Sequence, residues 1–224
     1  MADNNDSFIR EVNEELRSDQ VRNVWTRFGP VIVAVAVLIV VGTASWRIYE
    51  YFQDQRATDT GDRFIAALDL ASKGDHDAAM KALADVEKDG HGAYPVLARF
   101  RVATLKAEAG DAKGAAEAFS AIGDDTSVPE ALRDVARVRA GLLLVDLSDY
   151  KAVSDEVEAL AVAGNPLRNS AREALGLAAY KAKDLGKARE WFEQITEDTE
   201  APRNISTRAQ IMLDDITASQ GPAA

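Results

Sequence analysis

The sequence of 224 residues contains no cysteine and only two histidines, His76 and His91. Without cysteine the chain cannot form disulfides, thiolate zinc sites, iron–sulfur clusters or a cysteine nucleophile. Two isolated histidines leave little material for metal binding or acid–base catalysis. Walker loops, glycine-rich dinucleotide turns, G-x-S-x-G elbows and H-E-x-x-H motifs are missing as well. We therefore expect no enzymatic activity, no cofactor and no metal site.

Basic residues are fewer than acidic ones. The chain has 26 Lys and Arg against 37 Asp and Glu, which gives a net charge of -11. An acidic surface repels phosphate backbones, so we expect no nucleic-acid partner. No sequence motif for a small-molecule substrate is present either. The length suits one ordinary domain with an appendage.

One stretch is apolar enough to cross a membrane. Residues 28–46 carry no charge, and residues 31–41 (VIVAVAVLIVV) are all apolar. A helix of this length crosses a hydrocarbon core of about 30 Å. Trp25 and Trp46 flank the stretch and are predicted membrane-interface anchors, because amphipathic rings prefer the headgroup layer. The alternatives are a buried core helix and a cleavable signal peptide, but the long charged segment before the stretch favours a retained anchor.

The segments on either side of this anchor are helical in pattern. Residues 1–27 place Phe8, Val12 and Leu16 at steps of four, which predicts an amphipathic segment that lies on the membrane, meets a partner or is simply solvated. Residues 47–59 are predicted to form a juxtamembrane helical linker. Four arginines precede the anchor and three lie in the seventeen residues after it, a weak bias that favours a cytoplasmic N-terminus.

The rest of the chain has the pattern of a helical repeat over residues 60–218, followed by a flexible tail at 219–224. Helix-forming residues dominate, and no alternating strand pattern occurs. Four segments align without gaps on aspartates that are 36, 38 and 35 residues apart, and each aspartate is predicted to cap a helix: Asp75, Asp111, Asp149 and Asp184. The predicted fold is all-α, with about four helix pairs and a final helix.

Columns of similar residues recur at fixed distances from these aspartates. Offsets of four, eight and eleven residues put three columns on one face of each second helix. These columns are Ala79, Ala115, Val153 and Ala188; Leu83, Phe119, Val157 and Phe192; and Val86, Ile122, Leu160 and Ile195. Each first helix has a small residue eight positions before the aspartate: Ala67, Ala103, Gly141 and Gly176. Small residues at matching positions predict closely packed helix pairs.

The sharpest polar feature is an arginine column on the first helices. Its members are Arg63, Arg99, Arg137 and Arg172, and Arg208 continues it in the final helix. One interpretation is a binding surface for acidic ligands. The other is a structural role, in which each guanidinium meets an acid on the next helix while its stem covers apolar surface. We favour the structural role because the column shares a face with the small packing residues.

An apolar stripe runs beside the arginine column and is a candidate polypeptide-binding groove. Its residues are Phe64, Leu68, Phe100, Val138, Leu142, Leu177 and Tyr180. If the first helices line a concave face, such a groove suits extended or helical polypeptide segments. The alternative is that a short array curls tightly and buries the stripe as core.

The repeat units resemble tetratricopeptide (TPR) repeats, which pair two antiparallel helices over about 34 residues. The nearest matches are Leu175-Gly176 with Asp184, Ala188 and Phe192, and Asp149-Tyr150 with Val153 and Val157. The arginine column stands where the family has an aromatic residue, and the period here is longer and uneven. The resemblance implies a TPR-like α-solenoid.

The order of parts resembles a family of single-pass inner-membrane proteins, the ancillary subunit of the Sec translocon, in its alphaproteobacterial form. The resemblance rests on the N-terminal stretch SFIREVNEELRSDQVRNVWTRFG, one anchor, the aromatic exit WRIYEYF and degenerate TPR-like helices. It implies a cytoplasmic N-terminus, a periplasmic repeat domain, and contacts with the translocon, periplasmic chaperones and emerging polypeptides. No catalytic or binding motif carries over.

The sequence thus supports three hypotheses about function. The first is a membrane-anchored, non-enzymatic scaffold or chaperone-like adaptor at the periplasmic side of the Sec translocon. The second is a TPR-type structural or regulatory adaptor for envelope or cell-division complexes. The third is an accessory protein of an enzyme or transporter, whose chemistry belongs to the partner. The sequence alone does not separate the first two.

Overall fold

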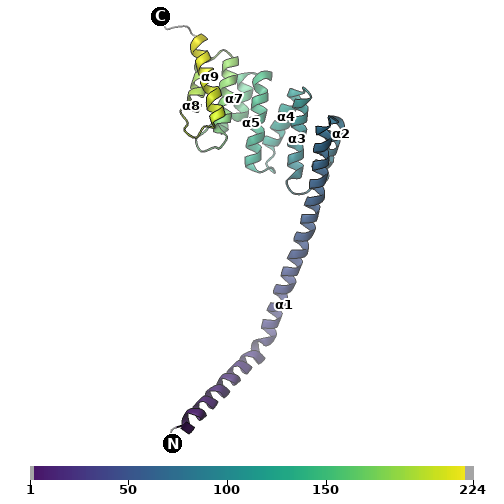
Figure 1. The fold of residues 1–224 in the computed structure, drawn as a ribbon, viewed down its shortest axis with the longest axis vertical. Helices are drawn as coiled ribbons and strands as arrows, with labels where there is room; N and C mark the ends of the chain where they lie inside the picture. The colour runs from purple at the N-terminus through teal and green to yellow at the C-terminus, as the bar shows by residue number, and fades with distance from the viewer. Residues whose placement is uncertain (1–2, 220–224) are drawn as a thin grey trace. The chain divides into compact units, whose positions relative to one another are not determined.

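The computed structural model describes the backbone of residues 3–219 and the side chains of residues 28–52 and 55–219. All regular structure in this part of the chain is helical, which confirms the predicted all-α class (Figure 1). The helices in chain order are α1 (Asp3–Ser72), α2 (His76–Asp89), α3 (Tyr94–Glu108), α4 (Ala112–Asp124), α5 (Glu130–Leu147), α6 (Tyr150–Val157), the 3-10 helix η1 (Glu158–Leu160), α7 (Arg168–Lys181), α8 (Leu185–Thr196) and α9 (Arg203–Ser219).

The chain divides into two compact units, Met1–Arg56 and Ala57–Ala224. Helix α1 contributes to both, because it continues past the boundary between them. The second unit contains the end of α1 and all later helices. The predicted helix pairs therefore lie within one unit.

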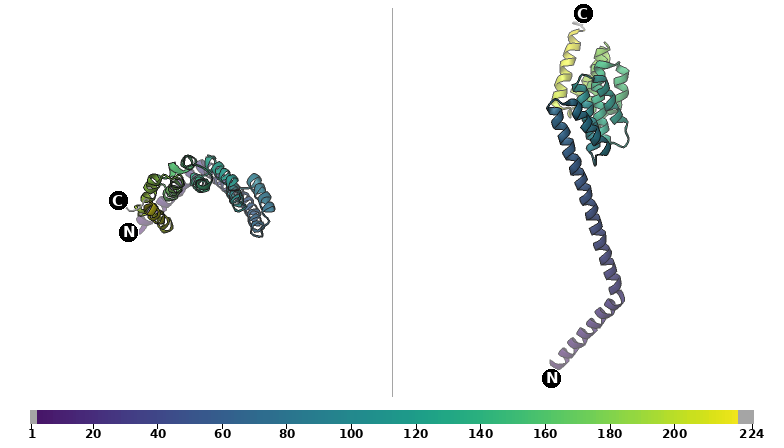
Figure 2. Two further views of the ribbon diagram at one scale, coloured as in Figure 1. Left: turned by 90° about the horizontal axis from the view of Figure 1, so that it is seen from above. Right: turned by 90° about the vertical axis from the view of Figure 1, so that its right-hand side faces the viewer.

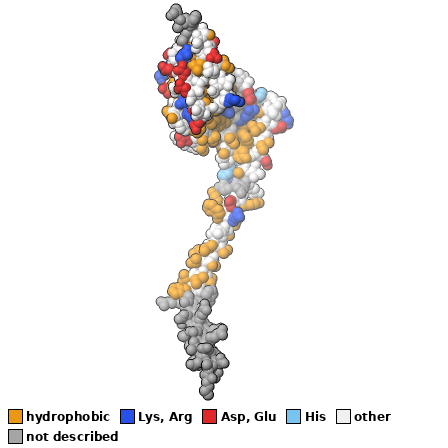
Figure 3. Space-filling view, turned by 60° about the vertical axis from the view of Figure 1, so that its left-hand side comes forward, with side chains coloured by type: hydrophobic (Ala, Val, Ile, Leu, Met, Phe, Trp, Pro, Cys, Tyr) orange, Lys and Arg blue, Asp and Glu red, His pale blue; other side chains and the backbone are white. Residues whose placement is uncertain are grey.

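Helix α1 carries the apolar stretch. From Phe28 onward it is the one helix of the described residues that is long and apolar enough to cross a membrane. The valines, leucine and isoleucines of residues 31–41 are exposed, and Figure 3 shows many hydrophobic side chains, in orange, on the described part of this helix that precedes the repeats. Trp46 is exposed as well. The side chains of residues 1–27, which include Trp25 and the expected amphipathic face, lie outside the described ones.

The second unit is a row of packed helices. From α2 onward, consecutive helices contact each other, and in addition α5 contacts α7 and α7 contacts α9. Seen from above in Figure 2, the helices of this unit lie along an arc. Four hydrophobic clusters among the described residues follow one another along the row. Repeats that bury their apolar surface against their sequence neighbours form a solenoid, as predicted.

The recurring aspartates cap helices α2, α4, α6 and α8. In each case the carboxylate accepts a hydrogen bond from the backbone N–H three residues later, at 2.9 to 3.2 Å: Asp75, Asp111, Asp149 and Asp184. The first N–H groups of a helix have no partner within the helix, and an aspartate before it supplies one. The predicted caps are confirmed.

The columns that follow the aspartates form the interior of each helix pair. The first of these columns is fully buried in all four pairs: Ala79, Ala115, Val153 and Ala188. Glycines in the first helices allow the closest contacts. A Cβ added to Gly176 would lie 2.8 Å from two ring carbons of Phe192, and one added to Gly141 would lie 2.5 Å from Cγ1 of Val157. A larger residue at either position requires the facing side chain or its helix to shift.

Candidate protein-binding face

The first helices carry the arginine column, and its members differ in their contacts. Arg99 on α3 forms an ion pair with Asp125, which follows α4, at 2.6 Å. Arg137 on α5 lies 3.6 Å from Asp124 at the end of α4, so this pair connects α5 to the preceding helix instead of the next one. Arg63 is exposed. The contacts of Arg99 and Arg137 thus connect first helices with the ends of second helices.

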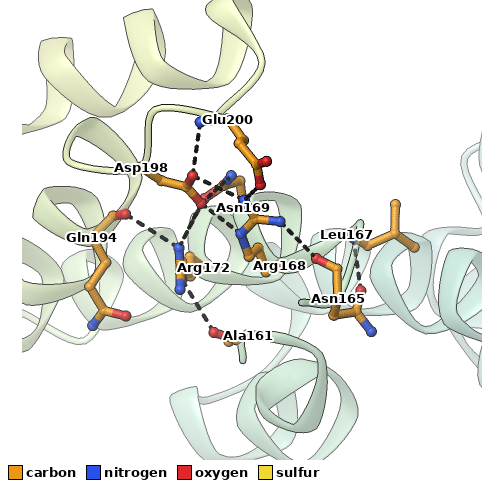
Figure 4. A network of polar contacts seen from close by, with 9 residues as sticks. All are labelled: Ala161, Asn165, Leu167, Arg168, Asn169, Arg172, Gln194, Asp198 and Glu200. Carbon is orange, nitrogen blue, oxygen red and sulfur yellow. Dashed lines mark hydrogen bonds and ion pairs between the residues drawn. The ribbon is translucent and has the colours of Figure 1, made fainter. Parts of the chain in front are cut away.

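The densest polar network surrounds Asp198, in the loop between α8 and α9 (Figure 4). Arg168 donates to both oxygens of this carboxylate, at 2.6 and 3.0 Å. Asn169 and Arg172 donate to it at 3.0 and 3.3 Å, and the backbone N–H of Glu200 donates at 3.0 Å. The Arg168 guanidinium, and then the Asn169 amide, hold the pKa of Asp198 well below its usual range. The network fixes the loop to α7.

A smaller version of this arrangement lies two repeats earlier. Asp125 accepts hydrogen bonds from the hydroxyl and the backbone N–H of Ser127 and from Arg99. The hydrogen bonds from Ser127, and then the one from Arg99, lower the pKa of Asp125 to about 2. This carboxylate is therefore ionised at neutral pH and anchors the turn after α4 to α3.

The apolar stripe is divided between core and surface. Val138 is buried and belongs to the cluster formed by α5, α6 and α7, which corrects its assignment to a groove. The reason is that α5 packs on both of its successors, so this side of α5 is covered. Phe64 and Phe100 are half-buried against the core, and Leu68 is half-buried as well. Leu142 is 40% exposed.

Two aromatic residues of the stripe make specific contacts. Phe100 meets Phe119 edge to face with ring centroids 5.9 Å apart, and the guanidinium of Arg139 lies over both rings. The hydroxyl of Tyr180 donates to Asp215 on α9 at 2.5 Å, and this hydrogen bond raises the pKa of Tyr180. Both residues therefore connect neighbouring helices and are only partly open to a ligand.

An apolar hollow lies where α5, α7 and α9 meet, and it has a volume of ≈ 460 Å³. Its lining residues are Leu142, Glu173, Leu177, Phe192, Arg208, Ile211 and Met212. Ile211 is 60% exposed at its edge, whereas Phe192 is buried. A hollow of this size accommodates large apolar side chains of a partner. We refer to these seven residues as the α5–α7–α9 hollow.

One ion pair lies within this apolar hollow. Arg208 donates from Nε and Nη2 to the two carboxylate oxygens of Glu173, at 2.5 and 2.8 Å. The Glu173 side chain is 9% exposed and that of Arg208 is 52% exposed. The hydrogen bond to Glu173 raises the pKa of Arg208. A buried carboxylate thus holds a half-exposed guanidinium in a fixed orientation.

Sequence reasoning missed two parts of this face. It did not extend the apolar stripe into α9, where the residues at the stripe's three offsets from Arg208 (Ala209, Leu213 and Ile216) are buried and Ile211 is exposed instead. It also missed the aspartates that bind the arginine column. Asp125 and Asp198 both lie 26 residues after a column arginine, and this spacing was a usable signal.

The side chains on this face are suited to binding a partner. Among the described residues, no group of three or more His, Asp or Glu side chains is placed to hold a metal ion. His76 is exposed, and the backbone N–H of His91 donates to the hydroxyl of Thr60 at 3.2 Å. The hollow offers carbon atoms and one guanidinium, which suit recognition of a polypeptide side chain.

No curated protein and no solved structure matches the chain. The family model described as a tetratricopeptide repeat-like domain matches residues 22–218. Domains of this kind generally mediate protein–protein interaction and are generally non-catalytic scaffolds. The match covers most of the chain and agrees with the helix pairs and their caps, so the chain belongs to the tetratricopeptide repeat-like domain family.

Proposed function

We propose that this protein is a membrane-anchored, non-enzymatic scaffold that binds protein partners at the periplasmic side of the Sec translocon. The observation that carries the proposal is the α5–α7–α9 hollow, an apolar surface of a TPR-like array that is lined by α5, α7 and α9 and by Phe192 of α8. Exposed apolar surface between rigid helices is a usual docking place for a polypeptide. The partners we propose are the translocon, periplasmic chaperones and emerging polypeptides, on the strength of the resemblance in domain order.

The proposed anchor is residues 28–46, with residues 47–59 as its juxtamembrane linker. Its support is the run of exposed apolar side chains on α1, which water would solvate poorly. In this proposal Trp46 lies at one membrane interface and Trp25 at the other, because amphipathic rings prefer the headgroup layer. The four arginines before residue 28 favour a cytoplasmic N-terminus, which puts the repeat domain in the periplasm of a bacterial inner-membrane protein.

Fusion reporters test the topology. A reporter that is active only in the periplasm is expected to be active after Ala224 and inactive before Ser7. A cytoplasmic reporter at the same two positions should give the reverse result and serves as the control. Activity of the periplasmic reporter only before Ser7 would contradict the periplasmic assignment of the repeats.

Purification from native membranes tests the partner. The full chain, tagged at its C-terminus and extracted in mild detergent, is expected to enrich translocon subunits over a single-pass inner-membrane protein of similar abundance. Enrichment of cell-division or envelope-assembly proteins without translocon subunits would instead support the second hypothesis, an envelope adaptor.

A further inference from the structure

The Glu173–Arg208 ion pair leaves one end of the guanidinium unused. Glu173 accepts hydrogen bonds from Nε and Nη2 of Arg208. Nη1 has no hydrogen-bond partner among residues 28–52 and 55–219, and the Arg208 side chain is half-exposed. A guanidinium has donors on more than one edge, so a second carboxylate can bind at its free end.

Five of the seven residues that line the hollow are apolar, and the other two are Arg208 and Glu173. Leu142 and Ile211, on α5 and α9, are exposed members of the hollow, and Leu177 and Met212 are half-buried. In the preceding repeats the stripe position of Glu173 is held by Phe64, Phe100 and Val138, so the carboxylate is an exception in its own column. Its buried position and double hydrogen bond give Glu173 the geometry of a residue that positions Arg208.

Charge is unevenly distributed between the two helix layers. Helices α3, α5 and α7 together have nine Lys and Arg and five Asp and Glu, a net charge of +4. Helices α2, α4, α6 and α8 together have six Lys and Arg and ten Asp and Glu, a net charge of -4. These three helices are therefore positive within a chain whose net charge is -11, whereas residues 57–72 of α1 have one Arg and three Asp, and α9 has two Arg and two Asp. Charge complementarity between this layer and a ligand favours an acidic one.

We infer that the α5–α7–α9 hollow binds a polypeptide segment in which large apolar side chains flank an acidic side chain. The apolar side chains enter the hollow between Leu142 and Ile211, and the carboxylate accepts hydrogen bonds from Nη1 of Arg208. Glu173 is the positioning residue, because it holds the guanidinium at the edge of the hollow. The inference deepens the proposed function, since it rests on the hollow being the polypeptide-binding surface.

The test uses the full chain in detergent micelles and labelled synthetic amphipathic peptides. One peptide has leucines at helical spacing with a glutamate between them, and two others have glutamine or lysine in place of that glutamate. Fluorescence anisotropy gives the dissociation constants. We expect the glutamate peptide to bind about tenfold more tightly than the glutamine peptide, because a charge-assisted hydrogen bond is added.

Three variants locate the effect. The double variant E173Q/R208Q removes both charges without leaving one buried and unpaired, and it should bind the glutamate and glutamine peptides equally. Arg203→Ala removes a positive charge from the same helix outside the hollow, and it should keep the full preference. Ile211→Ser should weaken binding of every peptide by about tenfold, since it removes an exposed apolar contact.

Circular dichroism melts verify that each variant is folded. If E173Q/R208Q does not fold, Arg208→Lys replaces it, and it should lose most of the preference because an ammonium on Glu173 has no planar second edge. A preference for the lysine peptide, equal binding of the glutamate and glutamine peptides by the unmodified chain, or a preference that survives in folded E173Q/R208Q or in folded Arg208→Lys would overturn the inference. So would light scattering that shows a dimer dissociated by Ile211→Ser, because a second copy would then occupy the hollow.

These outcomes are separate from those of the proposed function. Discrimination between the peptides without enrichment of translocon subunits would refute the Sec assignment and leave the acidic-segment inference intact. Enrichment of translocon subunits without discrimination between the peptides would refute the acidic-segment inference and leave the Sec assignment intact.

Discussion

The first and last helix pairs are built from the same sequence columns but are stabilised differently. In the first pair, the end of α1 packs on α2 through Ala67 and Leu83, and Arg63 is exposed. In the last pair, α7 packs on α8 through Gly176 and Phe192. Here the loop after α8 is fixed to α7 by the network around Asp198, and α9 adds the Glu173–Arg208 ion pair.

The difference shows that apolar packing and polar contacts vary independently along the array. A larger residue in the second helix is matched by a smaller one in the first, as in Gly176 with Phe192, so the helices stay in contact in both pairs. The network around Asp198 and the Glu173–Arg208 ion pair lie at the C-terminal end. That end also carries the hollow, and fixed loops and helices keep a binding surface in one conformation.

The largest effect is expected from Gly176→Leu. A Cβ at this position already lies 2.8 Å from the Phe192 ring, and a leucine would force α7 away from α8. Hydrogen exchange should show lost protection in α7, α8 and α9 and unchanged protection in α2 and α3. Gly186→Leu is the control, because Gly186 is exposed at the start of α8. Equal protection in both variants would mean that the two helices are not in close contact.

Truncation of a large column residue comes next. Phe192→Ala should lower the free energy of unfolding by ~3 to 5 kcal/mol, because the ring is buried and leaves a cavity. Leu83→Ala, at the matching position of the first pair, should cost ~2 to 5 kcal/mol. Chemical denaturation measures both. A loss below about 1 kcal/mol for either variant would show that its side chain is not in the core.

The network around Asp198 at the C-terminal end should stabilise the fold in a pH-dependent way. Hydrogen bonds hold the pKa of Asp198 below its ordinary value, so its contribution to stability is present above about pH 4 and is lost as the pH falls through the folded pKa. Asp198→Asn should therefore lower the melting temperature at about pH 7, and the difference from the unmodified chain should shrink at about pH 3.

Glu200→Gln is the matched control for this variant. Glu200 also accepts a hydrogen bond from Arg168, at 2.7 Å, but its side chain is 79% exposed. Exposed ion pairs contribute little, so its melting temperature should change less. A pH-independent effect of Asp198→Asn would indicate that the carboxylate charge is not what stabilises the loop.

The helix caps should give the smallest effects and no difference between the two ends. Asp75→Ala and Asp184→Ala each remove a carboxylate that accepts one backbone hydrogen bond. Each should cost about 1 kcal/mol in thermal denaturation. A cost near zero at one end alone would mean that water or another group replaces that cap.

Repetition made the fold predictable from the sequence. Asp75 and Asp184 mark helix starts, and fixed offsets from them gave the buried columns. The site was less predictable, because the burial of a side chain depends on which later helices pack against its own helix. Val138 is core since α5 contacts both α6 and α7, and Ile211 is exposed although its neighbour Leu213 is buried. The hydrogen bonds of Asp198 depend on the conformation of the loop after α8, and the periodicity of the sequence does not determine that conformation.

Site-specific photocrosslinking in cells tests the central claim, that the face formed by the first helices binds protein partners. A photoreactive residue replaces Leu142 or Ile211 in the hollow, or Glu190 on the exposed surface of α8 as the control. We predict adducts with translocon subunits or with polypeptides in transit at positions 142 and 211, and none at 190. Adducts at position 190 with none at the two hollow positions would contradict the account.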